Sequence, residues 1–207
     1  MKRSTRFAAF LAGGLLVAGI GCLVAASPAV KGSVAAAALA PDEITKILDN
    51  AEKESKRVNS LLRVNASGQA QSCRMHIVVV DRGGRIVGQR SMADAWVGSI
   101  YIARSKAYTA NAFSSNENAL TTRTLGALTQ PGGPLWNIGN SNRQDGLIEF
   151  PGGVPLYKGG ELVGAIGVSG DGVEQDEDVA EAGTKGFEAP NAIRVDTVTG
   201  GKVPYTK

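Results

Sequence analysis

The sequence predicts an α+β protein in which helices cover an antiparallel sheet. One observation is the order of the expected elements, which runs helix, hairpin, helices, strands, helix and lacks the regular strand–helix alternation of a parallel sheet. A second observation is that glycine-rich turns at residues 82–84 and 158–160 join neighbouring strands, as short turns do between antiparallel strands. About 165 residues follow an N-terminal leader, which is enough for a single domain with a sizeable core.

The first half of the chain predicts a helix followed by a hairpin. Apolar residues recur at helical spacing over residues 42–64, which predicts the first helix. Residues 66–72 are small and polar, and we expect a loop there. Residues 74–92 predict a β-hairpin, because residues 75–80 are mostly apolar and β-branched and residues 82–84 tolerate a tight turn.

The second half predicts helices and short strands separated by glycine- and proline-rich loops. The expected helices cover residues 99–113, 121–129 and 174–187, and the expected strands cover residues 147–150, 154–157 and 161–169. Residues 191–207 show no strong period. We therefore expect a C-terminal tail after residue 190.

Residues 1–40 have the composition of an export signal. Three basic residues within the first six precede an uncharged stretch over residues 7–30, and mostly small residues continue to residue 40. We expect secretion or release into a periplasm. Two alternatives stay open: the apolar run is long enough to anchor the chain in a bilayer, and Cys22 is a candidate for lipidation.

Charge and composition exclude a nucleic-acid partner. The chain has 22 Lys+Arg and 19 Asp+Glu; residues 1–40 hold four of the basic residues and no acidic one, which leaves 18 against 19 and a net charge of −1. No basic face is left for a phosphate backbone, and aromatic residues are too few for a stacking platform. Cys73 is the one cysteine after the leader, so we expect no intrachain disulfide but a small buried residue beside a strand.

Five short motifs, four of which contain glycine, occur in a fixed order between residues 78 and 182. They are Val78-Val79-Val80-Asp81-Arg82-Gly83-Gly84, Ala103-Arg104-Ser105-Lys106-Ala107-Tyr108-Thr109-Ala110, Gln130-Pro131-Gly132-Gly133-Pro134-Leu135, Gly152-Gly153-Val154-Pro155-Leu156, and Gly164-Ala165-Ile166-Gly167-Val168-Ser169-Gly170 running into Val173-Glu174-Gln175-Asp176-Glu177. Together they resemble the GlcG/HbpS-like family of small haem-binding proteins. The resemblance covers most of the chain after the leader.

The resemblance implies a fold and a domain boundary. It implies a sheet of about five antiparallel strands with helices on its faces, a profilin-like α-β-α layering. The family-like domain would cover residues 41–190, between the leader of residues 1–40 and the tail of residues 191–207. It also implies haem as an exchangeable cofactor.

One side of the expected helix over residues 99–113 is the candidate ligand face. Ile102, Lys106, Thr109 and Phe113 fall at helical positions i, i+4, i+7 and i+11, so they share a side. Haem needs this mixture, because its ring takes apolar contacts, its propionates take cations and its iron takes a donor atom. The alternative is a surface helix edge with a solvated lysine.

Lys106 and Thr109 have individual roles in this expectation. Lys106 would meet a propionate, with Arg104 or Arg123 as a second contact. Thr109 would lie toward the iron as a weak and exchangeable ligand. The family resemblance points to the same helix and to a threonine ligand.

His76 is the alternative iron ligand. It is the only histidine of the chain, and histidine is a common ligand of haem iron. The matching position in the family usually carries a small residue, so the resemblance does not support this role. The simpler interpretation is a partly buried histidine on a strand.

The leader and the resemblance together predict an exported protein that buffers, senses or slowly degrades haem, with a homo-oligomer and a membrane sensor as expected partners. Two other interpretations stay open. One is a non-enzymatic, homo-oligomeric module that modulates a membrane sensor or an exported oxidoreductase. The other is an enzyme acting on a corrinoid, a flavin or a hydroxy acid. No acid–base pair stands out, and the single histidine leaves no room for a zincin motif.

Overall fold

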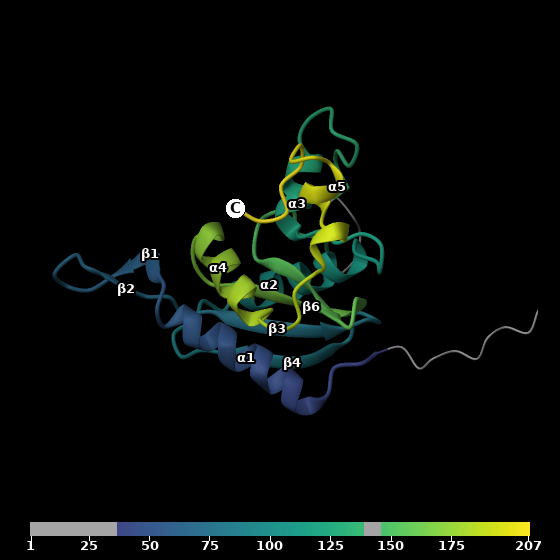
Figure 1. Cartoon of the computed structure of the whole chain (residues 1–207). Helices are drawn as coiled ribbons and strands as arrows, with labels where there is room; N and C mark the ends of the chain where they lie inside the picture. The colour runs from purple at the N-terminus through teal and green to yellow at the C-terminus, as the bar shows by residue number, and fades with distance from the viewer. Residues whose placement is uncertain (1–36, 139–145) are drawn as a thin grey trace, which may run out of the picture. The chain divides into compact units, whose positions relative to one another are not determined.

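In the computed structural model, which describes residues 37–138 and 146–207, the centre of the fold is a four-stranded antiparallel sheet (Figure 1). Its strands stand in the order β4-β3-β6-β5. Their bounds are His76–Asp81 for β3, Ile86–Ser91 for β4, Gly153–Lys158 for β5 and Glu161–Ser169 for β6. The predicted hairpin is confirmed, because β3 and β4 pair directly through the expected turn.

Helices cover both faces of this sheet. α1 (Pro41–Ser55) and α4 (Val173–Gly183) lie on one face and α2 (Ser99–Ala112) on the other. The alternation of side chains along β3 explains this layering: Ile77 and Val79 pack toward α1 and α4, whereas Val78 and Val80 pack toward α2. The predicted α+β class with an antiparallel sheet flanked by helices is therefore confirmed.

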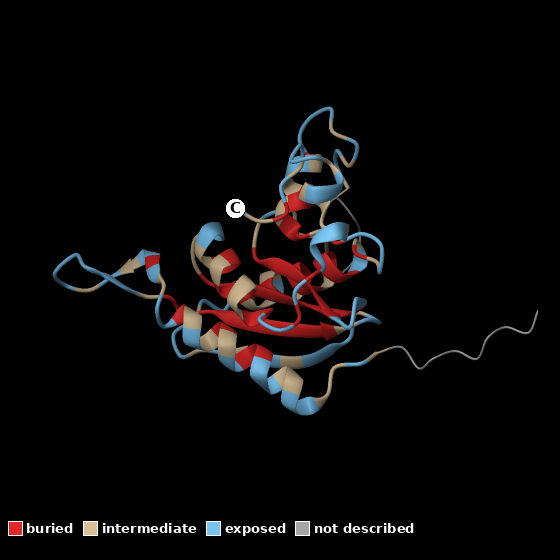
Figure 2. Cartoon of the chain, viewed as in Figure 1, coloured by how far each residue is buried: buried red, intermediate tan, exposed pale blue. Residues whose placement is uncertain are grey.

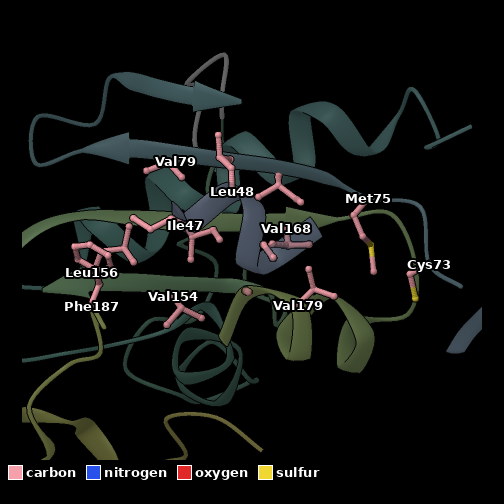
Figure 3. Packing of buried hydrophobic residues seen from close by; sticks show 14 of the residues in the cluster. Ile47, Leu48, Cys73, Met75, Val79, Val154, Leu156, Val168, Val179 and Phe187 are labelled. Carbon is pink, nitrogen blue, oxygen red and sulfur yellow. The ribbon is translucent and has the colours of Figure 1, made fainter. Parts of the chain in front are cut away.

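The main core lies between the sheet and the pair α1 and α4. Figure 3 shows Ile47 and Leu48 of α1 directed toward the strands, close to Val79 and Val168. Figure 2 shows that the buried residues gather on the sheet and on the inner sides of these helices. Such burial of apolar surface is the main stabilising contribution to the fold.

The opposite face of the sheet is packed more closely. Ala103 and Ala107 of α2 lie against β6, where a Cβ built on Gly167 would come within 2.9 Å of the Ala107 side chain. Small residues on both elements permit this approach. The helix predicted over residues 99–113 and its close packing are thus present.

The first helix is shorter than predicted. α1 ends at Ser55, and the chain then forms a separate hairpin of β1 (Asn59–Val64) and β2 (Ala70–Ser72) that extends away from the sheet in Figure 1. The expectation of one helix over residues 42–64 is wrong, because Asp171 accepts hydrogen bonds from the Ser60 hydroxyl and from the Leu61 N–H and holds β1 in place. Of the apolar residues that suggested a longer helix, Val58 packs against the main core but Leu61 and Leu62 are exposed.

The predicted strand over residues 147–150 is absent. This segment runs without strand pairing, so the main sheet has four strands in the described residues instead of about five. α3 (Thr122–Leu128) matches its expected position, while α4 ends four residues before the predicted end. α4 stops where a Cβ on Gly183 would overlap Ile166 of the sheet.

The C-terminal segment is folded onto the domain. After Pro190 it forms a 3-10 turn, η1 (Asn191–Ile193), and a short helix, α5 (Val195–Val198). The Ala119 N–H donates to the Ile193 carbonyl at 2.8 Å, and Tyr205 is buried beside Tyr157. Residues 191–207 therefore form part of the compact unit Ala35–Lys207 instead of a free tail.

The predicted leader and anchor fall on residues 1–36, outside the described residues. Within residues 37–138 and 146–207, no helix combines the length and the apolar character that a membrane crossing needs.

Candidate functional site

A buried ion pair lies where the ligand face was predicted. Lys106 on α2 donates from Nζ to Asp176 Oδ2 of α4 at 2.6 Å and to the Val168 carbonyl of β6 at 3.0 Å. The side chains are 0% and 2% exposed. The Phe150 ring covers the ammonium, with its centroid 5.0 Å from Nζ. The pair therefore joins two helices on opposite faces of the sheet.

Burial and pairing act in opposite directions on these two groups. Burial lowers the pKa of Lys106 and raises the pKa of Asp176, and the attraction between the two groups opposes both changes. The Asp171 N–H also donates to Asp176 Oδ1 at 3.2 Å. Every contact of the ammonium and the carboxylate thus lies inside the protein, and neither group is open to an external ligand.

Thr109 is internal as well. Its side chain is fully buried, and its Oγ1 accepts a hydrogen bond from the Ile148 N–H at 3.1 Å. The segment over residues 146–153 thus crosses the side of α2 that carries Lys106 and Thr109. The expectation that both residues face a haem-sized opening is wrong for this structure, and so is the alternative of a solvated lysine.

The other residues of the predicted face are only partly buried. Ile102 and Phe113 are of intermediate exposure. Arg104 is also partly exposed, and it donates from Nη2 to Gln89 Oε1 at 2.9 Å and lies 5.3 Å over the Tyr101 ring. Arg104 is therefore the predicted cation that stays within reach of a ligand.

Arg123, the expected second contact for a propionate, is already paired. It donates from Nε to both carboxylate oxygens of Glu177 at 2.9 Å and from Nη2 to Glu174 at 2.8 Å. The hydrogen bond to Glu177 is the largest of the effects that raise its pKa. Arg123 therefore serves to hold α3 against α4.

His76 has both ring nitrogens occupied. Nε2 lies 2.9 Å from the Trp96 carbonyl and Nδ1 lies 2.8 Å from Ser91 Oγ. Because a carbonyl only accepts, Nε2 carries a proton, and in the neutral imidazole Nδ1 then accepts from the Ser91 hydroxyl. His76 is also buried, so it positions the loop after β4 and offers no free nitrogen to an iron.

Three large apolar side chains are exposed at the start of α2. We call Trp96, Val97 and Tyr101 the aromatic platform; their exposed fractions are 44%, 84% and 64%. The Arg63 guanidinium lies 5.0 Å over the Trp96 ring, and Arg104 lies over Tyr101 as described above. The platform thus combines apolar surface with two cations.

This platform was not predicted from the sequence. The available signal was a tryptophan, a valine and a tyrosine within six residues that fit neither the apolar stripe of α2 nor a strand. Large apolar residues that belong to no predicted core face are candidates for an exposed binding surface, and this criterion identifies the platform.

No metal centre is evident in the described residues, where no group of three or more His, Cys, Asp or Glu side chains is placed to hold an ion. The acidic residues of α4 instead pair with cations: Glu174 with Arg123 at 2.8 Å, and Asp178 with Lys207. Cys73 is buried, as predicted.

The chain matches a protein family over most of its described length. The model of the family described as "Haem degrading protein HbpS-like" matches residues 54–185. An uncharacterized 15.0 kDa protein from the dhaT-dhaS intergenic region of Citrobacter freundii is 39% identical over 103 residues, which are 50% of this chain and 68% of that protein. The corrinoid adenosyltransferase PduO of Salmonella typhimurium (strain LT2) is 36% identical over 115 residues, 55% of this chain but only 32% of PduO.

Solved structures share the fold. The protein ORFY of Klebsiella pneumoniae is 26% identical with a TM-score of 0.57, covering 71% of this chain and 88% of ORFY. The PduOC:heme complex is 23% identical with a TM-score of 0.60, covering 83% and 100% of the two chains. An HbpS double mutant of Streptomyces reticuli is 21% identical with a TM-score of 0.53, covering 84% and 97%. The family match, together with this common fold, shows that the chain belongs to the HbpS-like family of haem-degrading proteins.

Proposed function

We propose that this chain is an exported haem-binding protein and that haem lies against the aromatic platform. The observation that carries the proposal is the platform itself, three exposed apolar side chains flanked by Arg63 and Arg104. A porphyrin is flat and apolar and carries two propionates, so it needs apolar surface beside cations. The two guanidinium groups supply the cations.

The comparisons support haem as the ligand. The description of the matched family names haem, and the PduOC neighbour was crystallised with heme. The interior of this chain is the less suitable site, because Lys106 and Thr109 are buried and hydrogen-bonded there. The ligand therefore has to use the surface of α2 and not its covered side.

The iron ligand in this proposal is Tyr101. Its phenol lies on α2 within the platform and is 64% exposed, and tyrosine is a known protein ligand of haem iron. Thr109, the hydroxyl expected from the sequence, lies two turns further along and is fully buried. A site open on one side suits haem that exchanges, as a buffering protein requires.

Titration of hemin into the purified protein tests the proposal. We expect a shifted Soret band and saturable binding. Trp96→Ser should weaken binding about tenfold or more, because a central aromatic contact dominates such a surface. Tyr101→Phe should change the position of the Soret band, since it removes the ligand oxygen but keeps the ring.

Trp136→Ser is the matched control, because Trp136 is the other tryptophan of the chain and is 59% exposed outside the platform. It should leave hemin affinity unchanged. A hemin spectrum identical to that of free hemin would overturn the proposal. Equal losses of hemin affinity in Trp96→Ser and Trp136→Ser would show that the platform is not the binding site.

The export part of the proposal rests on the leader, whose basic start and uncharged stretch are typical of a secretion signal. N-terminal sequencing of the chain recovered from the cell exterior or periplasm tests it. We expect a start near residue 41. Recovery of the intact N-terminus from the membrane fraction would contradict release and favour an anchor.

A further inference from the structure

A pocket of about 520 Å³ lies beside the base of the β1–β2 hairpin, and Trp96, Val97 and Tyr101 do not line it. It is formed by the C-terminal end of α1, the end of β2 and the end of β4. The polar residues that line it are Glu52, Lys56, Ser72, Arg74, Arg90, Ser91 and Asp94. Its volume falls within the usual range of small-ligand sites.

The charges in this pocket leave one cation uncompensated. Glu52 is neutralised twice, by Lys56 at 2.6 Å and by Arg90 at 2.9 Å, and the hydrogen bond from Lys56 lowers the pKa of Glu52. Asp94 is the remaining acid, and its side chain is exposed to solvent.

Arg74 is the uncompensated cation. Its Nη1 donates to Ser72 Oγ at 2.8 Å and to the Cys73 carbonyl at 3.3 Å. Its Nε and Nη2 have no hydrogen-bond partner among residues 37–138 and 146–207, and no carboxylate there pairs with it. A guanidinium with two free donor positions binds carboxylate or phosphate oxygens in a fork.

Ser91 links the pocket to the aromatic platform. Its hydroxyl lines the pocket and also donates to His76 Nδ1, while His76 Nε2 holds the Trp96 carbonyl. A ligand that accepts the Ser91 O–H removes the hydrogen bond to Nδ1. The His76 imidazole, which holds the Trp96 carbonyl, then loses one of its two hydrogen bonds.

We propose that this pocket binds a small oxyanion, a carboxylate or a phosphate, through Arg74, Ser72 and Ser91, and that His76 transmits its binding to Trp96. The site does not depend on haem. It is therefore tested on the haem-free protein, so that failure of haem binding and failure of this site are separate results.

Isothermal titration with sodium phosphate and, separately, with sodium succinate tests the site against sodium chloride at equal ionic strength. We expect saturable binding of at least one oxyanion, and the stronger of the two identifies the type of ligand. Arg74→Gln should weaken binding about ten- to a hundredfold, because a charged fork is lost. Binding of neither oxyanion at millimolar concentration would overturn the site.

Arg57→Gln is the matched control. Arg57 is a nearby exposed arginine that pairs with Glu54 and does not line the pocket, and its loss should leave the affinity unchanged. Circular dichroism melting checks that the variants fold, and Ser72→Ala gives a second test that leaves the charge intact. If Arg57→Gln and Arg74→Gln lowered the oxyanion affinity equally, the loss would come from the change in net charge and not from a specific contact. That result would overturn the site.

The transmission to Trp96 has its own measurement. In a Trp136→Phe background, Trp96 is the only tryptophan, and its emission should shift when the oxyanion binds. The shift should vanish in His76→Ala while calorimetric binding persists. Binding without any shift of the Trp96 emission would overturn the transmission through His76.

Discussion

At the scale of single residues, the Lys106–Asp176 pair is an ion pair that is almost completely buried in the interior. Both charged side chains are removed from water, which costs desolvation free energy. The short distance between the two charges and the additional hydrogen bonds to the Val168 carbonyl and from the Asp171 N–H offset this cost. The pair thereby fixes α2 relative to α4. Its importance for stability is that removing one partner would leave the other charge buried and unpaired.

Removing one partner should therefore destabilise the fold strongly. We expect Lys106→Met to lower the free energy of unfolding by about 3–5 kcal/mol, because it leaves Asp176 buried without a cation. Urea unfolding followed by circular dichroism measures this. The double variant Lys106→Met/Asp176→Leu should recover most of the loss, since no isolated charge remains.

Lys158→Met is the control for that measurement. Lys158 pairs with Glu43 at 2.8 Å but is 43% exposed, so its loss should cost less than about 1 kcal/mol. Equal losses from Lys106→Met and Lys158→Met would show that burial does not determine the strength of these pairs.

Cys73 should be chemically silent in the native protein. Burial is the largest cause that raises the pKa of its thiol to about 12, and the thiolate is the reactive form. A thiol reagent such as Ellman's reagent at pH 8 should react with Cys73 only at the rate of unfolding, and rapidly in urea. Fast reaction under native conditions would contradict the buried position.

At the scale of elements, the segment over residues 146–153 decides what α2 can do. It crosses the Lys106 and Thr109 side of the helix and continues directly into β5. Gly152 makes this crossing possible, because its φ is +118° and a Cβ there would lie 2.8 Å from Lys106 Nζ and 2.7 Å from the Val168 carbonyl.

We expect Gly152→Ala to destabilise the protein by about 3 kcal/mol or more, since backbone strain adds to overlap with the ion pair. Gly160→Ala isolates the strain, because Gly160 also has a positive φ of +87° but has no atom within 4 Å of its Cβ position. That control should cost about 1 kcal/mol. Thermal or urea melting compares the two, and similar losses would show that Gly152 does not carry a packing role.

At the scale of the whole described unit, the C-terminal segment closes the domain. Tyr205 is buried with Tyr157 and Leu162, and Arg194 lies 4.4 Å over its ring. Thr124 Oγ1 donates to the Pro204 carbonyl at 2.9 Å and ties this segment to α3. The end of the chain is thus part of a third apolar cluster.

Two substitutions of Tyr205 separate its ring from its hydroxyl. Tyr205→Ala should cost about 3–5 kcal/mol, because a buried aromatic ring is lost. Tyr205→Phe should be neutral or slightly stabilising, since the hydroxyl is buried without a hydrogen-bond partner in the described residues. Urea unfolding distinguishes the two, and a large loss from Tyr205→Phe would show that the hydroxyl does make a stabilising bond.

Local patterns in the sequence sufficed for the elements whose signals are local. The β3–β4 hairpin follows from an apolar run and its turn, and α2 and α3 follow from helical spacing between breakers. The same method failed at residues 56–64. The spacing of Val58, Leu61 and Leu62 suits a helix, but hydrogen bonds to Asp171, more than a hundred residues away, hold this stretch as a strand.

The sequence by itself determined the family, the antiparallel α+β class and the side of α2 on which Lys106 and Thr109 lie. Only the tertiary structure decided what covers that side. Helical periodicity states which side chains point together, but the partner of Lys106 is 70 residues away and the cover over Thr109 is 39 residues away. Spacing along one helix carries no information about segments so far away in the sequence. For that reason Lys106 and Thr109, which were expected to face a ligand, are buried, and the exposed platform was not predicted.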